Sequence, residues 1–201
     1  MVDSDIIKPK NSDYSEDFFK LFLMSGPEFV PALYGGTHEG VIRNLYRYRE
    51  NMTSYEHVSF AQVDGKNSGM VCAYDWRQNE GEQAKTTLLM IRYMKLAFFK
   101  QARHFQWAGE VLGKMDDGTY YIASMAVYPE HRSRGLGMSL LKHVEGLARI
   151  AGATSVALDA ETYNEVAIRL YRSFGMETVG EPKSHNINGK DFEFVRMAKD
   201  L

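Results

Sequence analysis

The segment 129–141 reads PEHRSRGLGMSLL and places two arginines and two glycines directly before residues with helical periodicity. Arg132 and Arg134 carry planar cations with directional donors that suit phosphate oxygens. Gly135 and Gly137 let the backbone bend, so that successive N–H groups converge on one point. Because the first N–H groups of a helix lack intrahelical partners and the dipole adds positive charge there, this pattern favours binding of a diphosphate.

A structural reading of the same segment stays open, since glycines before a helix also form tight loops and arginines are often solvated. Neither of two common phosphate-binding motifs fits. No Lys-Ser or Lys-Thr pair follows Gly137, and Leu140 stands where the dinucleotide fingerprint needs a third glycine. The elements around the segment must therefore decide between the two readings.

Two buried strands and two helices surround the segment. Residues 120–127, YYIASMAV, are nearly all apolar or small, which is typical of a strand covered on both faces. The helix after the segment ends at Gly152, residues 154–158 predict a second buried strand, and a further helix ends at Gly175. This order of strand, helix, strand and helix predicts an α/β sheet with parallel pairing in this half.

The remaining chain predicts hairpins and helices, with two apolar segments of special interest. The expected elements are a strand at 4–8, helices at 14–24 and 39–51, a hairpin of strands at 57–63 and 69–74, and strands at 177–180 and 192–197 around Asn188-Gly189. Residues 29–36 are apolar but irregular, which predicts a loop that lines a pocket. Residues 82–112 predict helix throughout, with too many apolar side chains for one stripe; they form either two packed helices or one helix buried on several sides.

Composition excludes several classes of protein. A chain of 201 residues with 44% hydrophobic and 25% charged residues suits one soluble domain, and the net charge of −2 gives no general attraction to nucleic acid or an anionic membrane. One cysteine excludes an internal disulfide, and the six histidines lack metal-ligand spacing, so we expect no metal. No apolar stretch spans a bilayer, and residues 1–13 lack the order of a signal peptide, which favours a cytoplasmic location.

The segment in its context resembles motif A of the GNAT superfamily of N-acetyltransferases. Arg132, Gly135 and Gly137 match the family pattern of Arg or Gln, two residues, Gly, one residue, then Gly or Ala. Residues 164–176, with Asn, Ala, Leu-Tyr and Gly-Met at the matching places, are similar to a second family segment. The resemblance is strong over 120–180 and architectural before it.

The resemblance implies a fold and a cofactor site. The fold is α/β: a mixed, largely antiparallel central sheet with a parallel splayed pair, flanked by helices, in a single domain over 1–201 with a helical insertion at about 82–112 between the third and fourth strands. Backbone groups of 125–127 would pair with the pantetheine arm of coenzyme A, and the Val127 N–H would polarise the thioester carbonyl. The implied cofactor-binding residues are Met125, Ala126, Val127, Arg132, Ser133, Arg134, Gly135, Leu136, Gly137, Met138, Asn164 and Tyr171.

Two of these residues have a structural alternative. Asn164 matches the family position that contacts the pantetheine arm, and its alternative is helix capping; Thr162 and Glu165 fit a capping box, which would leave Asn164 free. Tyr171 matches the tyrosine that protonates the departing thiolate, and its alternative is packing on the inner face of its helix.

The general base is not evident from the sequence. Some family members place a glutamate on the fourth strand where this chain has Tyr121. The candidate substitutes are Glu161, Asp159, His131, Glu56 and Asp75. Cys72 has no identifiable histidine partner, so we interpret it as a small buried hydrophobic residue.

The resemblance thus implies an acetyl-CoA-dependent N-acetyltransferase, in which a primary amine attacks the thioester directly. Two alternatives stay open: a non-catalytic coenzyme A-binding sensor or interaction module, and an acyltransferase that uses a longer acyl-CoA. The expected partner is a small-molecule or peptide amine whose apolar portion contacts 29–36 and 82–112. Nucleic acid and membrane are not expected; a homodimer is common in the family.

Overall fold

The computed structural model describes residues 5–201, in which seven strands form one sheet of order β1-β2-β3-β4-β5-β7-β6. The strands are β1 (Asp5–Ile7), β2 (Val58–Val63), β3 (Lys66–Asp75), β4 (Thr119–Val127), β5 (Ser155–Glu161), β6 (Glu177–Ile187) and β7 (Lys190–Asp200). Neighbouring strands are antiparallel except for β4 and β5, which run parallel. The predicted mixed, largely antiparallel sheet with one parallel pair is confirmed, and residue 4 of the predicted first strand lies outside the described residues.

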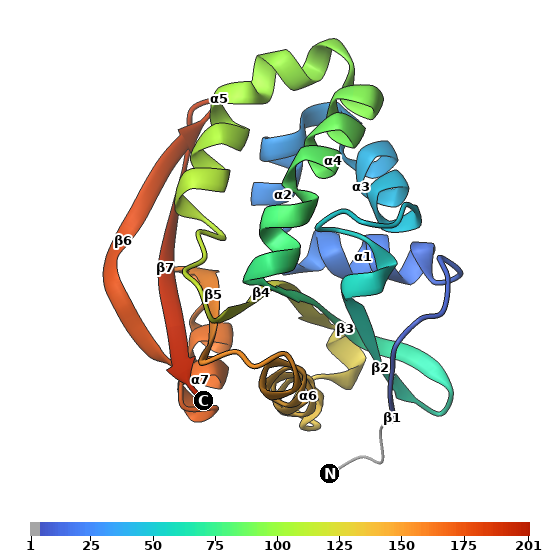
Figure 1. Ribbon diagram of the computed structural model, residues 1–201, viewed down its shortest axis with the longest axis vertical. Helices are drawn as coiled ribbons and strands as arrows, with labels where there is room; N and C mark the ends of the chain where they lie inside the picture. Colours follow the sequence, from blue (N-terminus) through green and yellow to red (C-terminus); the bar gives the residue numbers. More distant parts are fainter. Residues whose placement is uncertain (1–4) are drawn as a thin grey trace.

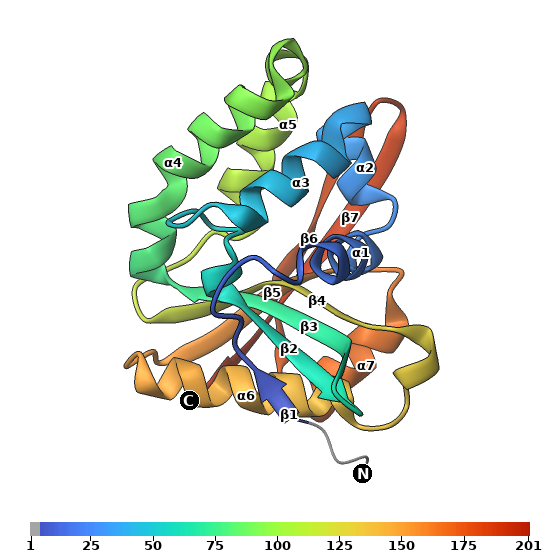
Figure 2. The ribbon, with the colours of Figure 1, turned by 90° about the vertical axis from the view of Figure 1, so that its right-hand side faces the viewer.

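Helices cover both faces of this sheet (Figures 1 and 2). The helices are α1 (Ser15–Ser25), α2 (Phe29–Tyr34), α3 (His38–Arg47), α4 (Trp76–Met94), α5 (Leu96–Val111), α6 (Leu136–Ile150) and α7 (Glu165–Ser173), and short 3₁₀ turns are η1 (Gly35–Thr37), η2 (Tyr55–His57) and η3 (Pro129–His131). Figure 2 shows α1 to α5 on one face and α6 and α7 on the other. Strands β4 and β5 therefore have α6 and α7 on one face and α1 to α5 on the other.

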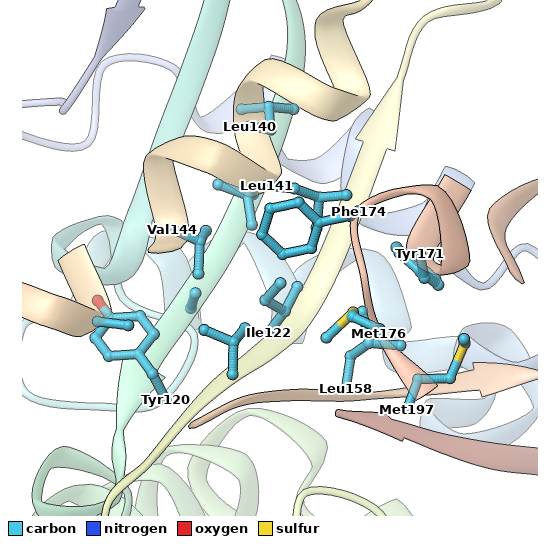
Figure 3. Close-up of a cluster of buried hydrophobic side chains, with 14 of the residues drawn as sticks. Tyr120, Ile122, Leu140, Leu141, Val144, Leu158, Tyr171, Phe174, Met176 and Met197 are labelled. Carbon is cyan, nitrogen blue, oxygen red and sulfur yellow. The ribbon is translucent and has the colours of Figure 1, made fainter. Parts of the chain in front are cut away.

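The main apolar core lies between α6, α7 and the sheet (Figure 3). Apolar residues at helical spacing give α6 one buried stripe, formed by Leu136, Leu140, Leu141, Val144 and Ala148. Ile122 of β4 and Leu158 of β5 meet this stripe from the sheet, 4% and 2% exposed. Burying each such side chain stabilises the fold by about 1.5–3 kcal/mol, so this packing holds α6 against the sheet.

The two hairpin turns follow the sequence prediction. Asp64 and Gly65 have φ of 51° and 70°, and Asn188 and Gly189 have φ of 53° and 87°. Positive φ at both central residues is the geometry of the type I′ turn, which Asp-Gly and Asn-Gly favour. The strands that flank Asn188 are longer than predicted. The sequence gave no sign of the full length of β6, because this strand is exposed along most of its length and carries no apolar alternation.

Two predicted segments need correction. Residues 29–36 are not a loop: Phe29 to Tyr34 form α2, with Pro31 tolerated in the first turn and with Val30 and Leu33 buried. The helical insertion begins at Trp76 rather than at 82, because the sequence from 76 to 81 is polar and shows no apolar period.

The insertion consists of two helices, which settles the alternative left open by its sequence. Lys95 separates α4 from α5 with φ of 53°, a conformation that no α-helix continues through. The hairpin of α4 and α5 lies between β3 and β4 in the chain, as predicted. Within residues 5–201, none of these helices is both long and apolar enough to cross a membrane.

The start of α4 generates a stability prediction. The Asp75 carboxylate accepts hydrogen bonds of 2.9 Å from the N–H groups of Arg77 and Gln78, and the Asp75 N–H donates to Gln78 Oε1 at 3.0 Å. Burial opposes ionisation of Asp75, but the donors of Gln78 and Arg77 outweigh it and hold the pKa of that carboxyl below its usual value.

Replacing Asp75 with alanine should lower the free energy of unfolding at pH 7 by about 0.5–2 kcal/mol, measured by urea denaturation. A depressed folded-state pKa stabilises the fold above the unfolded pKa, so the difference from wild type should shrink as the pH falls through the lowered pKa of Asp75. Glu80→Ala, at an exposed position of the same helix, is the control and should change stability little. An Asp75 variant as stable as this control would contradict the capping role.

Candidate functional site

The two parallel strands separate before they end. Their ladder joins Thr119 through Ile122 to Ser155 through Leu158, whereas β4 continues to Val127 and β5 to Glu161. On its other side β4 pairs Ser124 with Cys72 and Ile122 with Ala73, so Ala123 is an extra residue. Such a bulge bends its strand and increases the local twist. The second half of β4 therefore presents an edge that β5 does not pair.

The backbone groups on this edge can be identified from their neighbours. The Tyr128 N–H donates to the Ser68 carbonyl of β3 at 2.9 Å. Because backbone groups alternate sides along a strand, Ala126 also faces β3, while Met125 and Val127 face the unpaired edge. The Val127 carbonyl accepts a hydrogen bond from Arg132 Nε at 3.1 Å, which agrees with this alternation. The N–H groups of Met125 and Val127 are thus directed away from β3.

The arginine- and glycine-containing segment connects this edge to α6. Residues 132–135 are exposed, and two of them, Ser133 and Gly135, have φ of 59° and 92°. The Gly135 conformation is one that side chains strongly disfavour, which explains the glycine. The first α-helical bond runs from the Ser139 N–H to the Gly135 carbonyl at 3.0 Å. The N–H groups of 136–138 precede it and have the directions that an anion at a helix start requires.

Gly137 has a packing role that the sequence did not reveal. A Cβ built at this position would lie 2.8 Å from Leu170 Cδ2 of α7, well inside normal contact. The structure places the Leu170 side chain of α7 against the α6 backbone at this position. The glycine therefore makes room for the Leu170 side chain between the two helices that carry the two family-like segments.

Asn164 caps α7. Its Oδ1 accepts a hydrogen bond from the Ala167 N–H at 3.2 Å. The predicted capping box of Thr162 and Glu165 is wrong, because α7 begins at Glu165 and its N-cap is Asn164. The capping alternative for Asn164 is what the structure contains, and its oxygen is used in that contact.

Tyr171 of α7 belongs to the core between α6, α7 and the sheet and is 8% exposed (Figure 3). Burial raises the pKa of its phenol to about 12, so the hydroxyl stays protonated at neutral pH. Within residues 5–201 this hydroxyl makes no hydrogen bond. The side chain is thus both a packing residue and a protonated donor.

Tyr121 and Asp159 belong to one structural network. The Tyr121 hydroxyl donates to Asp159 Oδ2 at 2.9 Å, and Arg196 approaches the same carboxylate through Nε and Nη2 at 3.0 and 2.6 Å. The Gly113 N–H adds a further bond of 3.0 Å. Burial, and then the Asp159 charge, raise the pKa of Tyr121 well above its usual value. Asp159 therefore holds β4, β5, β7 and the end of the insertion together.

Two other candidate bases also have structural partners. Glu56 binds Arg49 at 2.9 Å and the Glu50 N–H at 2.9 Å, and Asp75 caps α4. His131 ends η3, and its Nδ1 is enclosed without a partner among the described residues.

Glu161, at the end of β5, differs from the other carboxylates. It is 6% exposed, and its Oε1 is enclosed without a hydrogen-bond partner in the part of the chain that the structure describes. Burial is the main cause that raises the pKa of this carboxyl. Asp159 and Glu161 are two residues apart in β5 and so lie on the same face, but the sequence gave no sign of which was already paired.

Cys72 is buried, and its Sγ lies 3.7 Å from the Met52 carbonyl oxygen. Burial raises the pKa of the thiol to about 12, so it stays protonated and is not poised as a nucleophile. Among residues 5–201, no three His, Cys, Asp or Glu side chains are grouped so that they could hold a metal ion.

Comparison with known proteins identifies the class of protein that this fold and site define. The sequence model of the acetyltransferase (GNAT) family matches residues 15–176, which is most of the chain. The chain therefore belongs to the GNAT family of N-acetyltransferases.

Named relatives match part of the chain. The chain is 32% identical to the N-alpha-acetyltransferase RimI of Mycobacterium tuberculosis over 86 residues, 42% of this chain and 52% of the relative. It is 33% identical to a putative [ribosomal protein bS18]-alanine N-acetyltransferase of Bacillus subtilis over 78 residues, 38% of this chain and 50% of the relative. The matched segments thus span about half the length of these relatives.

Solved structures support the fold. Ard1 from Thermoplasma volcanium superposes with a TM-score of 0.63 at 16% identity, covering 100% of this chain and 99% of that one. A Bacillus subtilis acetyltransferase in complex with CoA gives a TM-score of 0.53 at 13% identity, covering 100% and 99%. At these identities the likeness concerns the fold alone.

The contact between α6 and α7 generates a second prediction. Gly137→Ala should destabilise the protein by about 0.5–1.5 kcal/mol, because the added methyl forces the end of the Leu170 side chain away from its rotamer. The loss should be smaller when Leu170→Ala is already present, which a double-mutant cycle measured by urea denaturation would show. Equal losses in both backgrounds would contradict the steric explanation.

Proposed function

We propose that this protein transfers the acetyl group of acetyl-CoA to a primary amine by direct attack of the amine on the thioester. One observation carries the proposal: the unpaired edge of β4 leads directly into the loop and helix start that suit a diphosphate. The spacing of these features along one chain segment matches a ligand with a phosphate end and an amide-rich arm. Backbone N–H groups on an open edge can pair with such an arm as a neighbouring strand would.

The residues divide between the two ends of the cofactor. The N–H groups of 135–138 and the side chains of Arg134 and Ser133 bind the diphosphate. Arg132, held on the Val127 carbonyl, adds positive charge and orients the loop. Asn164 uses its oxygen for the α7 cap, which leaves its amide N–H groups for the pantetheine arm.

The chemical step uses the edge of β4 and Tyr171. The N–H groups of Met125 and Val127 serve the pantetheine arm and the thioester carbonyl, where negative charge develops. Tyr171 donates its proton to the departing thiolate, whose ordinary pKa of about 8.5 lies below that of the buried phenol. Positioning the amine beside the thioester supplies much of the remaining acceleration.

The acceptor binds beside α2, the end of α5 and the β6–β7 hairpin. Phe29 of α2 packs edge-on against Phe192 and Phe194, with ring centroids 5.3 and 4.8 Å apart, and Trp107 of α5 joins the same apolar cluster. Both segments proposed as acceptor walls thus meet here, although only the second half of the insertion takes part. Because two relatives are named for acetylation of an N-terminal or alanine amine, we propose a peptide α-amine as acceptor in the cytoplasm.

The cofactor site generates a third prediction. Gly135→Ala should weaken coenzyme A binding about tenfold in titration calorimetry, because alanine resists the φ of 92° that orients the loop. Gly146→Ala is the matched control, since its added methyl meets open space on the same helix. Failure of coenzyme A to bind the wild-type protein, or unchanged affinity in the Gly135 variant, would count against this site.

Tyr171 generates a fourth prediction. Tyr171→Phe should lower kcat about 10²–10⁴-fold with peptide amines while coenzyme A affinity stays nearly unchanged, since only the proton is removed. Because the pKa of Tyr171 is about 12, its ionisation should cause no decline of kcat below about pH 11 in the wild type.

Steady-state release of coenzyme A over a panel of peptide and small amines is the measurement for this function. Cofactor binding without turnover of any amine would favour the sensor alternative. Faster reaction with longer acyl-CoAs would favour the other acyltransferase.

A further inference from the structure

Two carboxylates lie on the same face of β5, but only one is neutralised. Asp159 faces Arg196 across the β5–β7 ladder and receives donors from Arg196, Tyr121 and Gly113. Glu161, two residues further, faces Phe194 instead, and Arg196 is committed to Asp159. Burying a carboxylate oxygen without a hydrogen-bond partner costs folding free energy, so the presence of Glu161 here calls for a function.

The position of Glu161 is set by the divergence of the strands. The last pair of the parallel ladder joins Ile122 to Leu158. Glu161 lies as far beyond Leu158 in β5 as Met125 lies beyond Ile122 in β4. Since carboxyl ends of parallel strands share one edge of a sheet, Glu161 and the Met125 N–H lie on opposite sides of the opening between the strands.

The surroundings of Glu161 combine apolar walls with nearby charge. Phe194, its partner in the ladder, packs on Phe29 of α2. Tyr163 is a neighbour of Glu161 that lowers the pKa of its carboxyl, and Tyr163 is 57% exposed, so this side of the carboxyl leads towards solvent. Burial, and then the charge of Glu28, raise the pKa of Glu161, while Tyr163 and Lys190 act in the opposite direction.

We propose that the acceptor amine binds to Glu161 in its ammonium form, and that Glu161 removes a proton from it before the amine attacks the thioester. This role deepens the proposed function and rests on it. The enclosed Oε1 provides the acceptor atom, the apolar cluster of α2 and β7 holds the substituent, and Tyr163 connects the carboxyl to solvent. An elevated affinity for protons suits a group that must take one from an amine.

The reaction begins with the transfer of a proton from the acceptor to Glu161. The ammonium group gives one proton to the Glu161 carboxylate and becomes a neutral amine. The nitrogen lone pair forms a bond to the thioester carbon, and the carbonyl electron pair moves to oxygen. When this pair returns, the C–S bond breaks, Tyr171 protonates the sulfur, and the second nitrogen proton restores Tyr171 through water. Glu161 then releases its proton towards Tyr163 and solvent.

The first test uses Glu161→Gln with acetyl-CoA and alaninamide, a small α-amine, as the probe. The variant should lose about 10²–10⁴-fold in kcat/KM, and the rise of kcat/KM with pH that follows Glu161 ionisation should disappear. Hydroxylamine is largely unprotonated at pH 7 and should show a much smaller loss. Glu181→Gln, at an exposed position of β6, is the matched control and should behave as wild type.

A second variant tests the direction of the pH effect. Tyr163→Phe removes the hydroxyl that lowers the pKa of Glu161, so the rising limb of the pH profile should move to higher pH without disappearing. A purely structural role for Glu161 predicts equal losses with both nucleophiles, a lower Tm and no shift of the limb in the Tyr163 variant. Equal losses with both nucleophiles, or an unshifted limb in the Tyr163 variant, would overturn the proposal.

A spectroscopic readout covers the case in which alaninamide reacts too slowly. In ¹³C-glutamate-labelled protein with coenzyme A bound, the signal absent from Glu161→Gln should titrate above the ordinary glutamate range, and alaninamide should lower that pKa. No response to alaninamide overturns the role of Glu161 alone, provided that calorimetry shows coenzyme A bound. Absence of coenzyme A binding overturns the proposed function as well.

Discussion

The separation of β4 from β5 is the constraint on which the site depends. One extra residue, Ala123, bends β4 so that the parallel ladder stops at Ile122 while the strand continues. If β4 and β5 paired along their whole length, the N–H groups of Met125 and Val127 would be used in ordinary sheet hydrogen bonds. The bulge keeps them available at the place where the chain turns into the loop before α6.

The rest of the fold keeps the separated strands in place without filling the space between them. On one face, Leu170 of α7 packs against α6 where Gly137 leaves room for its side chain. On the other, the Asp159–Arg196 pair and the Tyr121 hydroxyl hold the paired halves of β4, β5 and β7 together. The strands are thus rigid where they pair and open where they diverge, which is the arrangement that a preorganised site needs.

The sequence predicted the parts of this architecture that depend on local signals. The Asp64-Gly65 and Asn188-Gly189 turns, the end of α6 near Gly152 and the motif region all follow from residues adjacent in the chain. The short helix α2 was missed, because Pro31 and six residues give too little period to detect. The beginning of α4 was missed, because its first turns are polar and its start depends on the Asp75 cap.

The sequence predicted which residues form the candidate site, but not which of them contact one another. The loop residues and Tyr171 were placed by motif, and their roles stay predictions. Whether Asp159 or Glu161 was neutralised depends on Arg196, a residue far along the chain that the ladder of β5 and β7 brings into register. Likewise, the cap formed by Asn164 required the true start of α7. The partner of each of these side chains depends on contacts between distant parts of the chain, and the periodicity of the sequence does not reveal such contacts.

The place where the α4–α5 hairpin joins the sheet has an evolutionary consequence. Asp75 and Tyr120 are partners in the β3–β4 ladder, so the hairpin leaves and re-enters the sheet at neighbouring positions. Its length can therefore drift with little cost in chain closure and without disturbing the strand register. Selection can then reshape the acceptor wall contributed by α5 while leaving the nucleotide-facing loop before α6 untouched, so that descendants of one ancestor diversify in what they modify and keep a common donor.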